Sequence, residues 1–289
     1  MTQKFQSILF FFLFITCTGF AEQPETPPGN DTATYQYELS AAMIFRDEAP
    51  YLKEWIEYHK LVGVEHFYLY NNLSTDNYKE VLTPYILAGE VDLKEWPFES
   101  HNVAEWDVIQ VNACNHALEQ AKGHSKWLAV IDMDEFLVPV ADLDMITLLR
   151  KYDNAGGVYN PWVVFGTSWV KKIPDDKLLI EMLVHNGASQ HSLGKSIIRT
   201  EYTIHIRPHH ATYIPGKVEV QIPIQEMQIN HYWSRDEWYL YNFKIPRRAL
   251  WGTDAATCIR WATYATTYSI YSEPILRFVP PLRAKMGFQ

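Results

Sequence analysis

Residues 127–139, WLAVIDMDEFLVP, place three carboxylates at the end of an apolar run. The run begins at Trp127, and the carboxylates are Asp132, Asp134 and Glu135. A short apolar run of this kind predicts a buried strand. Carboxylates beside a core are costly unless they have a partner or a ligand. The stretch therefore indicates a strand that ends at a polar site.

An alternation of strands and helices leads up to this stretch. The predicted strands are residues 37–45, 65–72, 90–96 and 126–132, and the predicted helices are 46–63, 75–89 and 104–123. Strands joined by helices form a parallel sheet with right-handed crossovers. We therefore predict an α/β fold with a Rossmann-type, mostly parallel sheet flanked by helices. Ligands of such sheets bind at the carboxyl ends of the strands, where Asp132 and Asp134 lie.

The second half of the chain is less regular. Short strands broken by Gly and Pro are expected within 156–166, 195–214 and 227–233, and a helical end rich in Trp and Tyr follows. No internal repeat is visible. We predict one domain, residues 36–289, with an elaborated C-terminal half.

The N-terminus has the form of an export signal. Lys4 is followed by ILFFFLFITCTGFA, residues 8–21, an apolar segment that is short for a membrane span. Residues 1–21 are expected to be a signal peptide or a short membrane anchor, and the Pro-rich residues 22–35 a flexible linker. The protein is then expected on the secretory route or anchored in a membrane. This means a Golgi-type lumen in a eukaryote or the cell envelope in a bacterium.

Composition excludes several classes of function. The formal net charge of -9 argues against broad nucleic-acid binding, which needs a basic surface. With three cysteines, one of them in the N-terminal segment, a cysteine-based zinc site is not expected. Aromatic residues make up 15% of the chain and serve either core packing or stacking on sugar rings. Trp162, Trp169 and Trp233 are open to both interpretations.

Two aspartates one residue apart form a D-x-D pair. In an extended or turning segment both can reach one cation, directly or through water. Carboxylate oxygens are the ligands that Mg²⁺ and Mn²⁺ prefer, and such ions keep positions open for phosphate oxygens. The alternative interpretation is a solvated acidic loop.

The chain resembles glycosyltransferase family 92. The resemblance rests on IDMDEFLVP (131–139) and RDEAPYLKEWIEYHKLVGVEHFYLYNNLSTD (46–76). WVVFGTS, GKSIIRT and INHYWSRDEW follow in matching order, so that it covers about Ala41 to Trp251. It implies a GT-A-like fold with a nucleotide-sugar half and an acceptor side in the C-terminal half. It also implies inverting, metal-dependent transfer of a hexose, galactose in known members, from a UDP-sugar to a glycan acceptor.

The same resemblance implies roles for individual residues. Asp134 and His231 would be ligands of Mn²⁺ or Mg²⁺, and Asp132 would bind the metal or the ribose. A lone histidine such as His231 is otherwise more often a packed or hydrogen-bonded residue.

The resemblance also implies residues that bind the donor. Arg46 and Glu48 would line the uridine pocket, Asn71 would contact the base or ribose, and Lys195 the diphosphate or the acceptor.

An inverting transfer also needs a base that takes the proton of the acceptor hydroxyl. Asp254, Asp236 and Glu135 are the candidates, with Asp254 favoured. The alternative for Asp254 is an N-cap of the following helix, and the alternative for Glu135 is positioning of the donor sugar.

Two other classes of function remain open at this stage. One is a metal-dependent phosphoesterase that uses the same carboxylates. The other is an exported, lectin-like glycan-binding protein that uses its aromatic residues without catalysis. Membrane association through the N-terminus is compatible with each.

Overall fold

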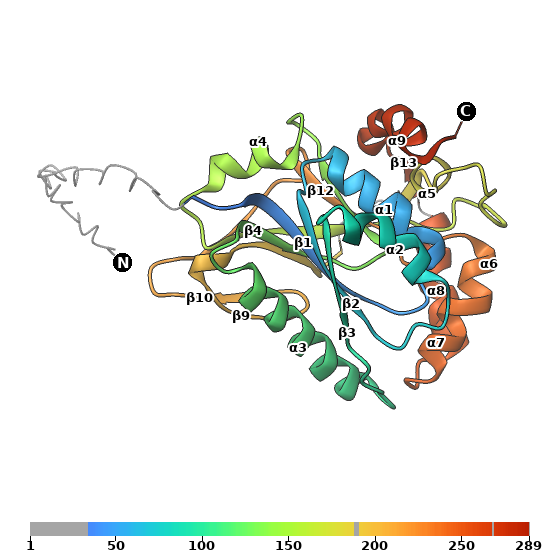
Figure 1. Cartoon of the computed structure of the whole chain (residues 1–289). Helices are drawn as coiled ribbons and strands as arrows, with labels where there is room; N and C mark the ends of the chain where they lie inside the picture. The colour runs from blue at the N-terminus through green and yellow to red at the C-terminus, as the bar shows by residue number, and fades with distance from the viewer. Residues whose placement is uncertain (1–33, 188–190, 268, 289) are drawn as a thin grey trace, which may run out of the picture. The chain divides into compact units, whose positions relative to one another are not determined.

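The computed structural model describes residues 34–187, 191–267 and 269–288 (Figure 1). Residues from Thr34 onward form one compact unit. The predicted signal or anchor, and residues 22–33 of the predicted linker, lie outside the described residues. In the described part, no helix combines the length and apolar character needed to cross a membrane.

The first half alternates strands and helices as predicted. Its elements are β1 (Tyr37–Phe45), α1 (Ala49–Leu61), β2 (His66–Asn71), α2 (Tyr78–Leu87), β3 (Val91–Glu95), α3 (Val103–Ala121) and β4 (Ser125–Val130). Strand β1 pairs in parallel with β2 and β4, and β2 pairs in parallel with β3. The predicted α/β class and the parallel sheet are therefore confirmed.

The second half extends the same sheet with strands of both directions. Its strands are β5 (Glu135–Pro139), β6 (Gly157–Val164), β7 (His185–Gly187), β8 (Gly194–Arg199), β9 (Thr203–Ile206), β10 (Ala211–Tyr213), β11 (Glu219–Gln221), β12 (Met227–His231) and β13 (Ser269–Tyr271). The main sheet runs in the order β3-β2-β1-β4-β8-β6-β12-β5, and β11 also pairs with β6. Strand β12 lies between β6, to which it is parallel, and β5, to which it is antiparallel.

The helices of the second half are mostly short. They are α4 (Met145–Leu149), α5 (Leu179–Met182), α6 (Glu237–Tyr239), α7 (Ile245–Ala249), α8 (Ala255–Thr267) and α9 (Val279–Met286). Short 3₁₀ segments lie at Arg150–Tyr152, Thr200–Tyr202 and Pro274–Phe278, and a π-helical turn, Leu240–Lys244, joins α6 to α7.

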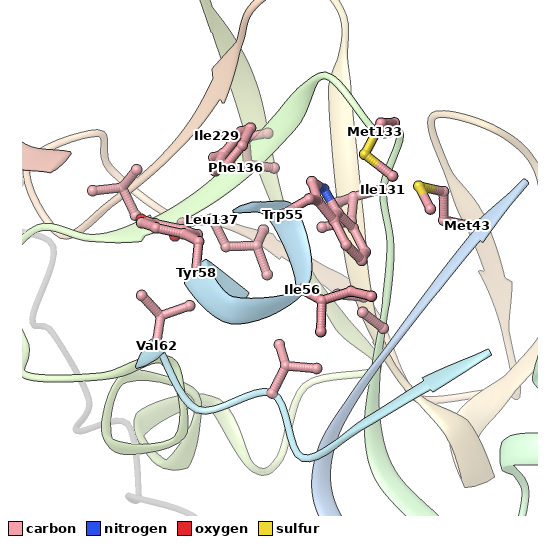
Figure 2. Packing of buried hydrophobic residues seen from close by; sticks show 14 of the residues in the cluster. Met43, Trp55, Ile56, Tyr58, Val62, Ile131, Met133, Phe136, Leu137 and Ile229 are labelled. Atoms are coloured by element: carbon pink, nitrogen blue, oxygen red, sulfur yellow. The ribbon is translucent and has the colours of Figure 1, made fainter. Parts of the chain in front are cut away.

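Two apolar clusters cover the two faces of the first half of the sheet. Helices α1 and α2 pack on the face that carries Met43, and α3 packs on the face that carries Ile44 (Figure 1). Trp55 of α1 lies near Met43 and Met133 in the first cluster (Figure 2). Met133 stands between the two aspartates of the D-x-D pair, so that its buried side chain anchors this turn in the core.

Candidate active site

A cavity of about 1030 Å³ lies at the carboxyl ends of the central parallel strands. Arg46 and Glu48 reach it from the end of β1, Asp132 and Asp134 from the end of β4, and His231 from the end of β12. The position predicted for the D-x-D pair is therefore confirmed: both aspartates follow the fourth parallel strand and line a cavity.

A hydrogen-bonded turn holds the D-x-D pair. The backbone N–H of Glu135 donates to the carbonyl of Asp132 at 3.0 Å, and the Glu135 carboxylate accepts from the N–H of Asp132 at 2.8 Å. Glu135 is fully buried and does not line the cavity. Burial raises its pKa well above the usual value, although the nearby Lys195 ammonium opposes this. In this geometry Glu135 supports the turn, and its role as a base stays a prediction.

Lys195 is buried, lines the cavity and binds Asp132. Its buried ammonium group lies 2.8 Å from Asp132 Oδ2 and 3.7 Å from Glu135 Oε1. Burial alone would lower the pKa of Lys195, but these two carboxylates outweigh it and raise that pKa. Gln110 of α3 donates to the other oxygen of Asp132 at 3.2 Å. Both oxygens of Asp132 are thus engaged by protein groups.

Asp134 and His231 come together through sheet pairing. The β5–β12 register sets His231 opposite Glu135, next to Asp134 in the chain. His231 Nε2 lies 3.5 Å from Asp134 Oδ1, and Lys244 Nζ lies 2.7 Å from Asp134 Oδ2. Burial raises the pKa of Asp134, but Lys244 and His231 outweigh burial and hold that pKa well below its usual value.

The donor set at Asp134 fits a divalent cation only in part. Among the described residues, no group of three His, Cys, Asp or Glu side chains gathers as a metal site. Asp134 Oδ1 and His231 Nε2 do face each other at 3.5 Å. Two ligands of one Mg²⁺ or Mn²⁺ stand roughly 3 Å apart, because the bonds are about 2.1 Å long. Two protein ligands fit there, with Asp132 held apart by Lys195.

The turn after β1 carries Arg46 and Glu48. Between them Asp47 adopts a left-handed backbone, with φ of 53°. Its carboxylate accepts from the N–H of Thr75 at 2.7 Å. Left-handed backbone costs energy for a residue with a Cβ, and such residues cluster at functional sites.

Two arginines from the second half fix this turn. Arg235 lies 2.7 Å from Glu48 Oε2, and Arg247 lies 3.4 Å from Glu48 Oε1. Arg247 also donates to the carbonyl of Arg46 at 2.9 Å. The proposed uridine pocket is therefore built from both halves of the chain.

Asn71 does not line the cavity. Its amide donates to Glu95 at 2.6 Å and to the hydroxyl of Tyr78 at 2.8 Å, so it ties β2 to β3 and α2. The next residue, Asn72, lines the cavity in its place. The contact of Asn71 with the base or ribose stays a prediction.

The other predicted base candidates act as helix caps. Asp236 caps α6 through the N–H of Tyr239 at 2.7 Å and also accepts from the N–H of Ile173. Asp254 precedes α8 and accepts from the N–H of Thr257 at 2.9 Å. Neither side chain lines the cavity. The alternative considered for Asp254 thus describes its geometry, and the roles of Asp236 and Asp254 as bases stay predictions.

Most charges that line the cavity are paired with one another. The pairs are Arg46–Asp47, Arg247–Glu48, Lys195–Asp132 and Lys244–Asp134. Asp107 of α3 and Arg248 of α7 also line the cavity. Within residues 34–187, 191–267 and 269–288, neither side chain has an ion pair or a hydrogen bond.

Sequence reasoning missed Asp107. The available signal was its spacing in α3, three residues before Gln110, which places both side chains on one helix face. Because Gln110 contacts Asp132, that face points to the D-x-D end of the cavity.

The profile of glycosyltransferase family 92 matches residues 36–254. The chain belongs to this family. Family 92 proteins from Ricinus communis and Oryza sativa subsp. japonica are 26% identical over 227 residues and 27% identical over 222 residues. These matches cover 74% and 73% of this chain, but only 38% and 36% of the relatives, so the chain spans well under half of their length.

Solved structures resemble the family 92 chain more distantly. The crystal structure of S. aureus TarS 1-349 is 11% identical in sequence and has a TM-score of 0.42. The match covers 78% of this chain and 70% of the TarS chain. The complex of the same protein with UDP is 12% identical and has a TM-score of 0.38, covering 57% of this chain and 47% of that one.

Proposed function

We propose that this family 92 chain transfers a hexose, galactose in the first instance, from a UDP-sugar to a glycan acceptor with inversion. The observation that carries the proposal is the cavity at the carboxyl ends of β1 and β4, where Asp134 and His231 meet beside Lys244. The donor class is the one that the resemblance to family 92 implies. As a glycosyltransferase of the predicted export route, it would work in a Golgi-type lumen or at the cell envelope.

The donor would lie along the central strand ends. Arg46, Glu48 and Asn72 line the side proposed for uridine, with Asn71 bracing it from behind. Lys195 supports Asp132, whose carboxylate faces the cavity and would bind the ribose. The diphosphate would then reach the Asp134 end.

Mn²⁺ or Mg²⁺ would be held by Asp134 Oδ1 and His231 Nε2. When bound, the cation supplies positive charge that neutralises the diphosphate of the leaving UDP. Lys244 binds the other Asp134 oxygen at 2.7 Å and fixes the orientation of the carboxylate.

We assign the base to Asp107, since it is the cavity-lining carboxylate without a partner in the described structure. The acceptor oxygen attacks the anomeric carbon while the bond from that carbon to the diphosphate oxygen breaks. The hydroxyl proton passes to Asp107, and UDP leaves with the bonding electron pair. Glu48, by contrast, is already engaged by Arg235 and Arg247.

A panel of UDP-sugars with Mn²⁺ or EDTA and mixed glycan acceptors tests the function. We expect UDP release that requires both an acceptor and a divalent cation. Hydrolysis of simple phosphate esters would favour the phosphoesterase alternative. Glycan binding without turnover of any donor would favour the lectin alternative.

A further inference from the structure

The two unpaired charges of the cavity flank one pair of stacked indoles. Trp106, next to Asp107 in α3, stacks on Trp251 with ring centroids 5.3 Å apart and an interplanar angle of 24°. Arg248 lies over the same Trp251, 5.8 Å from its ring centre. A carboxylate, a guanidinium and two aromatic rings thus meet where the start of α3 faces the α7–α8 connection. We call this region the α3–α7 corner.

Arg248 is the basic residue of the cavity that lacks a carboxylate. Its Nε atom is buried and has no hydrogen-bond partner in the described part of the chain. A guanidinium group keeps its charge at any physiological pH. Arg248 therefore cannot avoid the cost of a buried, unpaired N–H by losing a proton. Its contacts are the faces of Trp251 and Trp261, and cation–π contacts at 5.8 and 5.9 Å are long ones. An anion from a ligand would satisfy it.

The indoles of the corner offer surfaces for a sugar ring. Trp261 is 47% exposed, and Trp233 packs edge-to-face against it with centroids 5.5 Å apart. Both line the cavity together with Trp106 and Trp251. Aromatic faces carry negative charge density, so they attract the polarised C–H groups of a pyranose while its hydroxyls remain free for hydrogen bonds.

The anion that pairs with Arg248 could belong to the acceptor sugar or to the diphosphate of the donor. Lys244 and Arg248 are four residues apart, so their backbones are separated by about 6 Å along the helix axis. Lys244 already reaches Asp134, whereas Arg248 reaches Trp251 and Trp261. Arg248 therefore lies on the side of Trp251, whose ring stacks on Trp106, the neighbour of Asp107 in α3.

We propose that the α3–α7 corner binds the acceptor and selects an acidic sugar. The carboxylate of a uronic acid, or an equivalent anionic substituent, pairs with Arg248. Its ring lies against Trp251 or Trp261, and a hydroxyl faces Asp107. The assignment to the acceptor rests on the proposed function, whereas the affinity for an acidic sugar is a property of the corner alone.

Binding of two matched sugars tests the corner without turnover. Methyl β-D-glucuronide and methyl β-D-glucoside differ in charge but share the ring, and their binding is measured by ligand-observed NMR at about 0.15 M salt. We expect the wild type to prefer the glucuronide about tenfold or more, as a charge-assisted hydrogen bond provides. Arg248→Gln is expected to remove the preference, and Arg248→Lys to keep part of it. Arg260→Gln on α8 is the control, because Arg260 is exposed and bonds only Thr257 in the described structure.

UDP affinity, measured by calorimetry on the same variants, separates the two sources of an anion. We expect Arg248→Gln to change UDP affinity by less than about twofold. A marked loss would assign Arg248 to the donor diphosphate and overturn the proposal, as would equal binding of the two sugars by the wild type. A wild type that prefers the glucuronide but never binds UDP would instead overturn the proposed function and leave the acidic-sugar site standing.

Discussion

The two ends of the cavity differ in whether their charged side chains form ion pairs within the protein. At the D-x-D end, Asp132 and Asp134 each bind a lysine, and the pair of Lys244 with the buried Asp134 is strengthened because water screens it little. At the α3–α7 corner, Asp107 and Arg248 have no such partner among the described residues. The first end is preorganised by the protein itself, and the second is complete only with a ligand. Our proposal requires this arrangement, because it assigns one donor class to the first end and a selected acceptor to the second.

The largest effect is expected at the preorganised end. Asp134→Asn removes the charge that faces His231 and holds Lys244, so kcat/KM should fall about a thousandfold. Donor turnover with saturating Mn²⁺ measures it. Asp144→Asn, at the N-cap of α4 outside the cavity, is the matched control and should stay within about threefold. A comparable loss of kcat/KM in both variants would contradict a specific role of the D-x-D end in turnover.

A smaller loss is expected at the corner. Asp107→Asn should lower kcat about a hundredfold, since it deletes a general base, while UDP affinity stays unchanged. Single-turnover rates and UDP titrations of the same preparation measure both. If the rate is retained while Asp254→Asn abolishes it, the base lies at Asp254, as the sequence favoured.

Much of the preorganised end could be predicted from the sequence. The segments that form β1 and β4 are apolar runs, and the segments between them include two with the spacing of amphipathic helices. This local pattern alone predicted that Asp132 and Asp134 follow the end of a strand. Strand β5 was missed because it follows the turn at once and pairs with β12, some ninety residues later. Non-local pairing of this kind leaves no periodic trace.

The corner could not be predicted for a related reason. Arg248 stands out because it has no carboxylate partner in the described structure. Whether it has one depends on which carboxylates the neighbouring basic residues already bind. Lys244 meets Asp134 across 110 residues, and Arg247 meets Glu48 across 199. Once these pairs are known, Asp107 and Arg248 are identified as the charges without a partner in the described structure. No local sequence pattern indicates which charges stay unpaired.

The smallest effect concerns stability. The folded-state pKa of Asp134 is held below its ordinary value of 3.8, so its pairing stabilises the protein above that pH. This contribution is lost as pH falls through the folded-state pKa. Asp134→Asn should therefore lower the free energy of unfolding by about 1–2 kcal/mol at pH 7, and the difference should shrink below about pH 4. Urea unfolding across pH measures it.

Asp107→Asn provides the comparison for stability. Because Asp107 has no partner in the described structure, its variant should stay within about 0.5 kcal/mol of the wild type at pH 7. An equal loss in both variants would mean that Asp107 is paired in solution, and the contrast between the two ends would fail.

Calorimetric titration of UDP with Mn²⁺ into the wild type and Asp134→Asn tests the central claim most directly, namely that the D-x-D end is the donor site. We predict one UDP per chain in the wild type, at least about tenfold weaker binding in the variant, and loss of binding in EDTA. UDP affinity that is equal in both proteins and insensitive to EDTA would contradict the account.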